Sequence, residues 1–303
     1  MASEQQQNQQ AGQKQWTVLD LLNWTKQFFE NRNIESPRLE AEVLLAHVLG
    51  WQRIELYTKF DYIVPPDKRT QFREMISQRG EHRPTQYILG KTEFYSLEFA
   101  VNESVLIPRP ETEHLVEALV KRARELVEPA VLDIGTGSGC IPIAAAVNLP
   151  DARFTAVDVS PDALEIARQN AQKHDVAGRI DFRHGDMFEP VEGMLFDFIA
   201  SNPPYVSESE WQELMPEVKD YEPRQALLAG ADGLDAYRRL IPQASAHLNP
   251  GGRLLLEMPA GKCGRIREIA AQTPFVVEEV VPDYQKIERV LVLAIPGKEA
   301  SED

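Results

Sequence analysis

Cysteine is scarce in this sequence. The 303 residues contain two, Cys140 and Cys263. Two cysteines are too few for a disulfide framework, and their separation does not match the ligand spacing of a cysteine-based metal site. We therefore expect a protein of a reducing compartment that holds no metal, and we interpret neither cysteine as a nucleophile.

Long apolar runs are also absent. No apolar stretch approaches the ~20 residues that cross a bilayer, and the glutamine-rich segment 1–15 lacks the apolar core of a signal peptide. We expect a cytoplasmic protein that binds no membrane, with a disordered tail over residues 1–15 and a loose polar tail over residues 297–303.

Positive charge is in deficit. Lys and Arg number 32 against 47 Asp and Glu, which gives a formal net charge of -15. A field of this sign repels phosphate backbones over most of the surface, so we expect no direct nucleic-acid partner, although a local basic patch stays compatible with it. The hydrophobic fraction of 43% supports a sizeable core, and the length favours one main domain with a smaller one.

Residues 16–90 carry a helical pattern. One face of the first segment is apolar at helix spacing, with Val18, Leu21, Leu22, Thr25, Phe28 and Phe29. A second helix is predicted from Ser36 and Pro37 to about Gly50, because a cap residue is followed by the proline that first turns favour. A third is predicted from Asp67 to Arg79, after Pro65-Pro66. We predict a small helical bundle.

Residues 91–108 change to a period of two. Leu97, Phe99 and Val101 alternate with polar residues, a polar turn is expected at residues 102–104, and an apolar run follows at residues 105–107. We interpret this segment as a β-hairpin that links the two domains.

Residues 109–296 alternate between helix and strand patterns. A helix is expected over residues 113–126, and strands over residues 131–134, 154–158, 180–183, 196–200 and 253–257. Two further runs, 275–281 and 289–295, are joined by a loop too short for a crossover helix, so they should pair antiparallel at the sheet edge. The pattern predicts an α/β, Rossmann-like, doubly wound sheet of seven strands.

A glycine-rich turn follows the first of these strands directly. It consists of Gly135, Thr136, Gly137, Ser138 and Gly139. Glycines at a strand-to-helix turn let a ligand approach the backbone closely, although such turns also occur without a ligand. A dinucleotide fingerprint would read G-x-G-x-x-G, whereas this turn reads G-x-G-x-G. We interpret it as a cofactor site.

Two later strand ends add side chains to this site. Asp158 ends the second strand about 20 residues after the glycines, where a carboxylate can accept hydrogen bonds from both ribose hydroxyls of an adenosine. Its alternative role is to cap the next helix, which Ser160 fills better. Met187 follows the third strand, where adenine could lie against it, but it could equally belong to the core.

The tetrapeptide Asn202, Pro203, Pro204 and Tyr205 follows the fourth strand. An amide or aromatic amine is a poor nucleophile because its lone pair is delocalised. Acceptors aimed at its two N–H bonds would point that lone pair at a methyl group, and the Asn202 side-chain oxygen and the Pro203 carbonyl can supply them. Tyr205 could pack on the planar group. The tetrapeptide predicts methylation of a planar nitrogen, either of adenine or of glutamine.

With these motifs the sequence resembles the release factor glutamine N5-methyltransferases, of the class I methyltransferase superfamily. The resemblance runs from about Trp16 to Ile295. Its motifs are Val105 to Glu113, Asp133 to Gly139, Val157 to Leu164, Ser201 to Val206 and Tyr221 to Pro223. Residues 108–113 separate this family from other enzymes that carry the same tetrapeptide.

The resemblance implies peptide chain release factors as partners and the glutamine of their Gly-Gly-Gln loop as the target. The methyl donor would be S-adenosylmethionine, bound by Gly135 to Gly139, Asp158, Met187 and Asn202. Asn202 to Tyr205 would hold the glutamine. The helical domain would be a docking surface, or a structural support, of a monomeric enzyme.

Two positions depart from the family pattern. Family members often have an aromatic residue in place of Met187, and usually Glu-Ile-Gly followed by glutamine or histidine where this chain has Glu257 to Lys262. Two other functions stay open at this point. One is an adenine-N6 methyltransferase, which the acidic charge and the lack of a basic target-recognition segment disfavour. The other is a cofactor-binding protein without catalysis.

Overall fold

The computed structural model describes residues 15–296, which form parts of two compact units that meet between Leu89 and Gly90. The tail expected over residues 1–15 lies outside the described residues except for Gln15. The polar tail expected from Gly297 lies outside them entirely.

The first unit is helical. Its elements are α2 (Val18–Glu30), α3 (Pro37–Leu49), α4 (Arg53–Thr58), α5 (Pro66–Gly80) and α6 (Thr85–Leu89). The three longer helices confirm the sequence prediction, and their buried apolar side chains form one core. Helices α4 and α6 were not predicted, because six and five residues are too few to display a helical period.

The start of α3 differs from the expectation that Ser36 caps it. Ser36 has a left-handed backbone with φ of 48°, and its side chain accepts no capping hydrogen bond. A capping side chain reaches the first turn from an extended backbone, as Thr17 does for α2, where its hydroxyl accepts from the Asp20 amide at 3.2 Å. The helix α3 therefore starts on Pro37 without a side-chain cap.

The second unit begins with a two-stranded hairpin, β1 (Lys91–Phe94) and β2 (Leu97–Ala100), whose buried face packs with this unit. The predicted polar turn at residues 102–104 is present, since the Val105 amide donates to the Asn102 carbonyl at 3.1 Å, but it does not close the hairpin. The hairpin turns at Tyr95 and Ser96, which both have positive φ, and residues 105–107 form no strand. Such turns normally use Asn or Gly, so neither residue indicated a turn. Here the Tyr95 amide donates to the Glu113 carboxylate at 2.8 Å, a tertiary contact that fixes the turn.

A seven-stranded sheet forms the centre of the second unit. Its strands are β3 (Ala130–Ile134), β4 (Arg153–Asp158), β5 (Ile180–His184), β6 (Phe196–Ser201), β7 (Leu248–Glu257), β8 (Val276–Pro282) and β9 (Glu288–Ala294). The order is β5-β4-β3-β6-β7-β9-β8. The first five run parallel, and β9 pairs antiparallel with both β7 and β8. The predicted fold, including the antiparallel edge pair, is confirmed.

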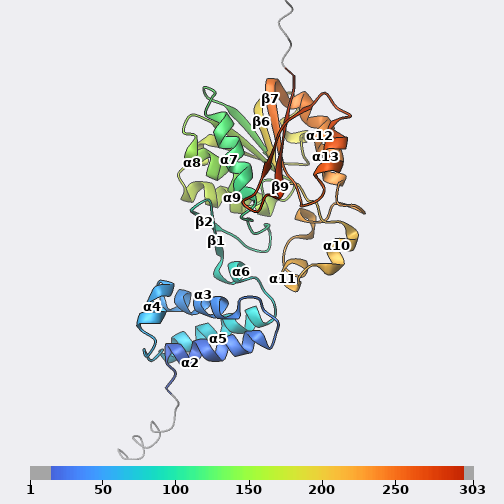
Figure 1. The fold of residues 1–303 in the computed structure, drawn as a ribbon. Helices are drawn as coiled ribbons and strands as arrows, with labels where there is room; N and C mark the ends of the chain where they lie inside the picture. The colour runs from blue at the N-terminus through green and yellow to red at the C-terminus, as the bar shows by residue number, and fades with distance from the viewer. Residues whose placement is uncertain (1–14, 297–303) are drawn as a thin grey trace, which may run out of the picture. The chain divides into compact units, whose positions relative to one another are not determined.

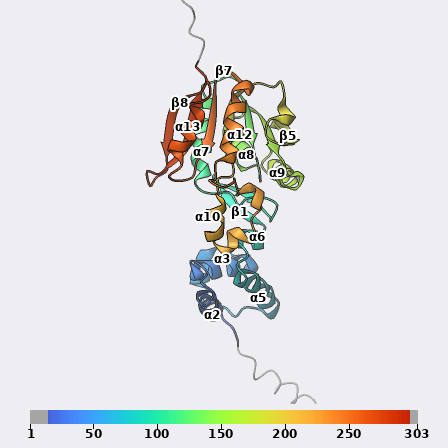
Figure 2. The same cartoon turned by 90° about the vertical axis from the view of Figure 1, so that its right-hand side faces the viewer.

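Helices cover both faces of this sheet (Figure 1). Helices α7 (Thr112–Ala123), α8 (Cys140–Asn148) and α9 (Pro161–Lys173) share one apolar cluster with one face. Helices α12 (Asp235–Ala244) and α13 (Cys263–Ala270) share another with the opposite face, which Figure 2 turns toward the viewer. The short helices α10 (Glu208–Glu213) and α11 (Pro216–Lys219) lie in the connection from β6 to α12.

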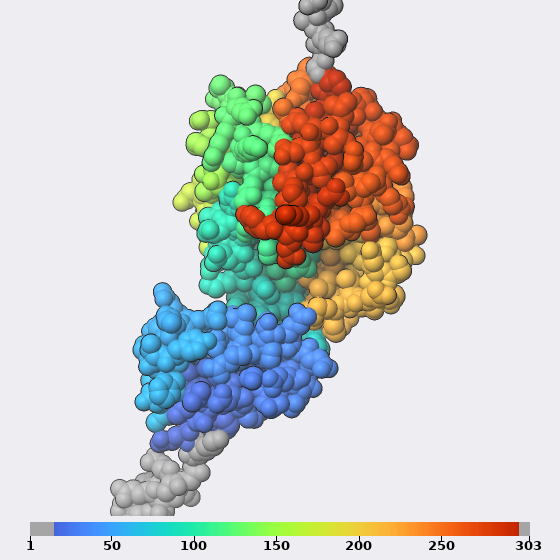
Figure 3. Space-filling view, viewed as in Figure 1, coloured from blue at the N-terminus to red at the C-terminus, as the bar shows by residue number. Residues whose placement is uncertain are grey.

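The edge pair is joined to α7, beside which it lies in Figure 3. The buried Arg122 of α7 donates to Glu278 of β8 at 3.1 Å and also pairs with Glu279. Charged side chains on an edge strand also hinder pairing with other chains. Within the described part of the chain, no helix is both long and apolar enough to cross a membrane.

Candidate functional site

A cavity of about 380 Å³ opens where β3, β4 and β6 end. The chain continues from β3 to β4 on one side and returns to β6 on the other, so the strand order reverses there and leaves a crevice at the carboxyl ends. Of the residues singled out in the sequence, this cavity is lined by Gly135, Gly137, Asp158, Met187, Asn202, Pro203 and Pro204. Thr136, Ser138, Gly139 and Tyr205 are not part of its lining.

The three glycines of the turn have different surroundings. A Cβ placed on Gly135 or Gly137 would meet no atom within 4 Å, so both leave open space. A Cβ on Gly139 would lie 2.8 Å from Cδ1 of Ile143 and 3.1 Å from Cβ of Ala167. Gly135 and Gly137 thus allow a ligand to approach the backbone, whereas Gly139 allows α8 to pack against α9.

The Asp158 carboxylate is held in place by the backbone. One oxygen accepts from the Gly137 amide at 2.8 Å, and the other accepts from the Ser160 amide at 2.9 Å. Burial raises the pKa of Asp158, and these amide hydrogen bonds oppose that rise. Ser160 caps α9 by accepting from the Ala163 amide at 3.2 Å, which confirms that Asp158 is not needed as the cap.

Met187 lies in the loop after β5 and lines the same cavity. Its φ of 50° is left-handed, which costs free energy in a residue with a side chain. The neighbouring Asp186 accepts a hydrogen bond from Arg239 of α12 at 2.5 Å, so this bond connects the loop after β5 to α12 at the cavity. Met187 also packs against the core cluster beside α12, and its contact with adenine stays a prediction.

Asn202 stands at the carboxyl end of β6, beside the end of β3. The hydroxyl of Ser201 donates to the Ile134 carbonyl at 2.7 Å and fixes the two strand ends together. The Asn202 amide nitrogen donates to the Thr112 hydroxyl at 3.1 Å. Its amide oxygen makes no hydrogen bond to the described part of the chain, and the residue lines the cavity.

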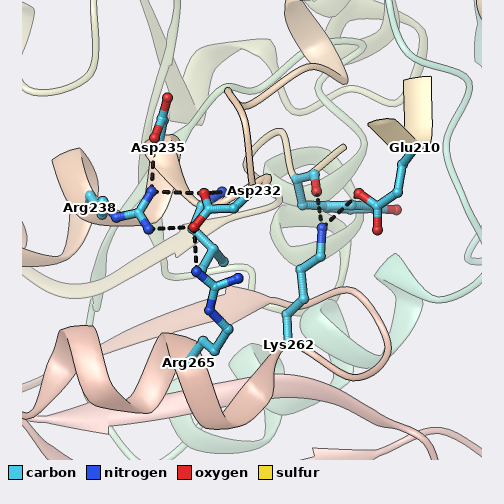
Figure 4. Close-up of polar contacts among 8 residues, drawn as sticks. Glu210, Asp232, Asp235, Arg238, Lys262 and Arg265 are labelled. Atoms are coloured by element: carbon cyan, nitrogen blue, oxygen red, sulfur yellow. Dashed lines mark hydrogen bonds and ion pairs between the residues drawn. The ribbon is translucent and has the colours of Figure 1, made fainter. Parts of the chain in front are cut away.

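Tyr205 ends the tetrapeptide away from the cavity. Its ring packs against the apolar clusters of α12 and of α10, and burial raises the pKa of its phenol to about 12. Its carbonyl accepts from Lys262 Nζ at 2.9 Å, and the same Nζ lies 2.8 Å from Glu210 of α10 (Figure 4). The predicted contact of Tyr205 with a planar substrate group stays a prediction.

Known proteins resemble this chain over most of its length. The model of the PrmC N-terminal domain matches residues 20–90, and that of the methyltransferase small domain matches residues 110–219. The release factor glutamine methyltransferase of Rhodopirellula baltica is 44% identical over 91% of this chain and 95% of its own length. The protein of that name from Geobacter sulfurreducens is 42% identical over 91% and 96%.

The chain belongs to the release factor glutamine methyltransferase family. The solved catalytic domain of hMettl16 shares the fold, with a TM-score of 0.51 and 18% identity over 75% of this chain and 83% of that one. At such identity the likeness concerns the fold alone. The family models and the curated relatives confirm the resemblance inferred from the sequence motifs.

In this methyltransferase, two of the family motifs meet in one ion pair. Arg109 donates to the Glu222 carboxylate at 2.6 Å, and the other oxygen of Glu222 accepts from the Ile107 amide at 3.3 Å. Glu222 is almost fully buried, so the pair joins the segment before α7 to the segment before the turn at residues 224–226. The two segments contribute Leu106 and Pro223 to the cavity wall.

A second group of ion pairs fixes the loop before α12 in the methyltransferase (Figure 4). Asp232 accepts from both terminal nitrogens of Arg238, at 2.9 and 2.6 Å, and also pairs with Arg265 of α13. These guanidinium groups hold the pKa of Asp232 well below its usual range. The adjoining Gly233 packs on the Tyr205 carbonyl, since a Cβ there would lie 2.2 Å from that oxygen.

Sequence reasoning did not assign a role to Thr112 or Glu257. Both are 2% exposed, and the Thr112 hydroxyl accepts from the Asn202 amide nitrogen. Burial raises the pKa of Glu257 to about 7, and its Oε2 has no hydrogen-bond partner among residues 15–296. Thr112 lies in the segment 108–113, whose only signal was its resemblance to the family.

The two cysteines are buried, and burial raises the pKa of the Cys140 thiol to about 12. Across residues 15–296, no group of three or more His, Cys, Asp and Glu side chains is placed to hold one metal ion. The expectation of an enzyme without a metal stays a prediction.

Proposed function

We propose that this enzyme transfers a methyl group from S-adenosylmethionine to the side-chain amide nitrogen of the glutamine in the Gly-Gly-Gln loop of peptide chain release factors. The observation that carries the proposal is the Asn202 amide, held by its nitrogen so that its oxygen is free, on the same cavity as Gly135 and Asp158. The names of the curated relatives support the choice of glutamine over adenine.

The cavity fits the methyl donor. Gly135 and Gly137 leave open space at their backbone, and the fixed carboxylate of Asp158 can accept hydrogen bonds from ribose hydroxyls. Met187 offers an apolar side chain to the adenine. When bound, S-adenosylmethionine supplies a methyl group on a positively charged sulfur.

The tetrapeptide prepares the glutamine amide. The Asn202 oxygen and the Pro203 carbonyl accept hydrogen bonds from its two N–H groups, which orients the amide plane so that the nitrogen lone pair, perpendicular to that plane, points toward the methyl group. Pro203 and Pro204 restrict the backbone, so this geometry loses little entropy when substrate binds. The same oxygens face the proton that leaves the methylated nitrogen, so a strongly basic side chain is not required.

The helical unit is proposed as the docking surface for the release factor. Exposed apolar side chains gather in α4 and the segment after it, with Ile54, Tyr57, Phe60, Tyr62 and Ile63 between 41% and 64% exposed. Exposed apolar groups at this density typically mark an interaction surface. A small-molecule substrate would not need such a surface. The enzyme would act as a monomer in the cytoplasm, where release factors are used.

Methyl-labelled S-adenosylmethionine tests the proposal directly. The enzyme is incubated with an unmethylated release factor, with its Gln→Ala loop variant and, separately, with unmethylated DNA. Label is expected on the glutamine of the intact loop alone. The Asn202→Ala enzyme should lose roughly 10²-fold in kcat, as expected when a polar group that stabilises the transition state is removed. Label on the Gln→Ala loop or on DNA alone, or full activity of Asn202→Ala, contradicts the proposal.

A further inference from the structure

Asn170 of α9 is a polar residue in an apolar part of the protein. It is 0% exposed, and it lies at helix spacing from the buried Ala167 and Ala171. Burying an amide costs free energy unless its oxygen and its two N–H groups find hydrogen-bond partners. The groups that Asn170 binds therefore indicate what the residue is for.

The side-chain amide of Asn170 is bound to the backbone through its oxygen and its nitrogen. Its Oδ1 accepts from the Ala100 amide at 2.7 Å, and its Nδ2 donates to the Ala100 carbonyl at 3.0 Å and to the Ser138 carbonyl at 2.9 Å. A backbone N–H can only donate and a carbonyl can only accept, so these partners allow one orientation of the side chain. Asn170 joins two segments that lie 70 and 32 residues away from it in the sequence.

The Ser138 carbonyl belongs to the glycine-rich turn of the candidate cofactor site. The three glycines of this turn all have positive φ, and glycine loses more conformational freedom on ordering than any other residue. Two side chains hold the middle of the turn. The Asp158 carboxylate accepts from the Gly137 amide at 2.8 Å, and Asn170 donates to the carbonyl of the next residue. The turn is thus fixed by side chains in the absence of a ligand.

The Ala100 contact brings a second part of the cavity wall into the same set of hydrogen bonds. Ala100 is the last residue of β2, and the chain continues from it to residues 104–106, which line the cavity. Gly135 and Gly137 of the turn line the same cavity. One buried side chain therefore connects the turn to the strand that precedes another part of the wall.

We propose that Asn170 is a positioning residue that orders the glycine-rich turn before S-adenosylmethionine binds. This inference rests on the proposed function. Asn170 does not line the cavity, so it acts through the backbone of the turn and not on the ligand. A turn that is already ordered loses less conformational entropy when the ligand arrives, which tightens binding without a further contact.

The test uses Asn170→Ala, which removes the amide, and Asn170→Leu, which removes its polarity at similar volume. Asn249→Ala is the matched control, because Asn249 also donates to another segment, at Asp197, but lies where β7 begins, away from the carboxyl ends of the strands.

A second control loosens the hairpin without touching the turn. The double variant Lys173→Met and His174→Phe removes two contacts of this helix end with Glu98 of β2 and leaves the Ser138 bond intact. For each protein, the Kd for S-adenosylmethionine is measured by calorimetry and folding by thermal unfolding. Hydrogen exchange of residues 135–139 is measured with and without S-adenosylmethionine, and kcat and KM are measured on the release factor.

Both Asn170 variants should raise the Kd for S-adenosylmethionine by roughly tenfold, the size of effect expected for one net hydrogen bond. Exchange of residues 135–139 without ligand should become faster in these variants, and S-adenosylmethionine should restore the protection. At saturating S-adenosylmethionine, kcat and the KM for the release factor should stay within about twofold, because the bound ligand orders the turn. Both controls should keep the Kd of the parent enzyme within about twofold.

An unchanged Kd in the Asn170 variants overturns the inference, as does an equal rise in either control. Exchange that becomes faster evenly over the second unit also overturns it, because the residue would then stabilise the fold in general. If neither Asn170 variant folds, the parent enzyme decides, since a turn that is unprotected without ligand contradicts prior ordering. Failure of the proposed function looks different: S-adenosylmethionine would bind, but the parent enzyme would transfer no label to the intact loop.

Discussion

Glu257 is a buried titratable residue at the end of β7. Burial raises its pKa to about 7, so its state changes near neutral pH. The titratable or charged groups that influence it or are influenced by it are Arg109, Glu111, Arg289, Tyr205, Tyr237 and Cys140. Above this pKa the side chain is a buried negative charge, and below it the side chain is neutral.

We therefore expect the free energy of unfolding to fall as the pH rises from about 5 to about 8, because the folded protein binds this proton more tightly than the unfolded chain does and loses that advantage above the pKa of about 7. Urea unfolding of the parent protein and of Glu257→Gln, which cannot titrate, at several pH values measures the effect. The variant should have a flatter profile; a fall of the same shape in both proteins would assign the titration to another group.

Thr25 is a buried residue whose hydroxyl has no hydrogen-bond partner within the part of the chain that the structure describes. It lies inside α2 on the face that packs in the core of the helical unit. Thr25→Val removes an unsatisfied polar atom at almost constant volume, so it should raise the free energy of unfolding by about 1 kcal/mol. Urea unfolding measures the change. The activity should be unaltered, and a destabilised variant would show that the hydroxyl is satisfied in solution.

At the scale of elements, the loop from β7 to α13 supports the end of the tetrapeptide through Lys262. This ammonium group holds the Tyr205 carbonyl and the Glu210 carboxylate. A glutamine amide at this position could also donate to the carbonyl.

Lys262→Met should lower kcat by roughly tenfold, because a slightly misplaced tetrapeptide no longer aligns its acceptors. Lys262→Gln should retain most of the activity through its amide N–H. Lys173→Met, which removes a lysine from the surface ion pair with Glu98, is the matched control and should change kcat less than twofold. Steady-state kinetics would disprove the role if Met and Gln at position 262 behaved alike.

In the turn from β3 to α8, Gly139 is needed for helix packing, whereas Gly135 leaves space for a ligand. Gly139→Ala should destabilise the protein by roughly 2–4 kcal/mol, because its Cβ would collide with Ile143 and Ala167 and φ is +78°. Gly135→Ala meets no atom and should cost about 1 kcal/mol through its positive φ. Its main effect should be weaker binding of S-adenosylmethionine. Thermal unfolding and calorimetry together check the contrast, and equal effects in both assays would refute it.

At the scale of the whole molecule, the proposed chemistry and the proposed docking surface belong to different units. The cavity lies wholly within the second unit. The exposed apolar segment 54–63 lies in the first. Loss of docking should consequently affect the release factor and leave S-adenosylmethionine binding intact.

Ile54→Ser, Phe60→Ser and Ile63→Ser combined should raise KM for the release factor by roughly tenfold or more, since exposed apolar anchors dominate such interfaces. Kd for S-adenosylmethionine should not change. Val127→Ser, at an exposed apolar side chain of the second unit, serves as the control. An unchanged KM in the triple variant would assign the helical unit to structural support.

The sequence predicted the sheet well because buried parallel strands appear as continuous apolar runs. Four of the five parallel strands and the edge pair fall within one residue of their predicted bounds, whereas β7 begins at Leu248, five residues before its predicted start. Helices α4 and α6 were not predicted because they are short. The hairpin turn was not predicted because Tyr95 and Ser96 are not residue types typical of turns. Ser36 had the right residue type for a cap but the wrong backbone.

By itself, the sequence determined the fold class, the family and the candidate residues Gly135, Asp158 and Asn202, because local patterns carry that information. Tertiary structure decided how those residues are supported. Thr112 and Asn202 are 90 residues apart, and Tyr205 and Lys262 are 57 apart. Such contacts depend on the order and register of parallel strands, which bring distant strand ends together at one edge of the sheet. No local pattern records that arrangement, so only the folded chain reveals which end of the Asn202 amide faces the cavity.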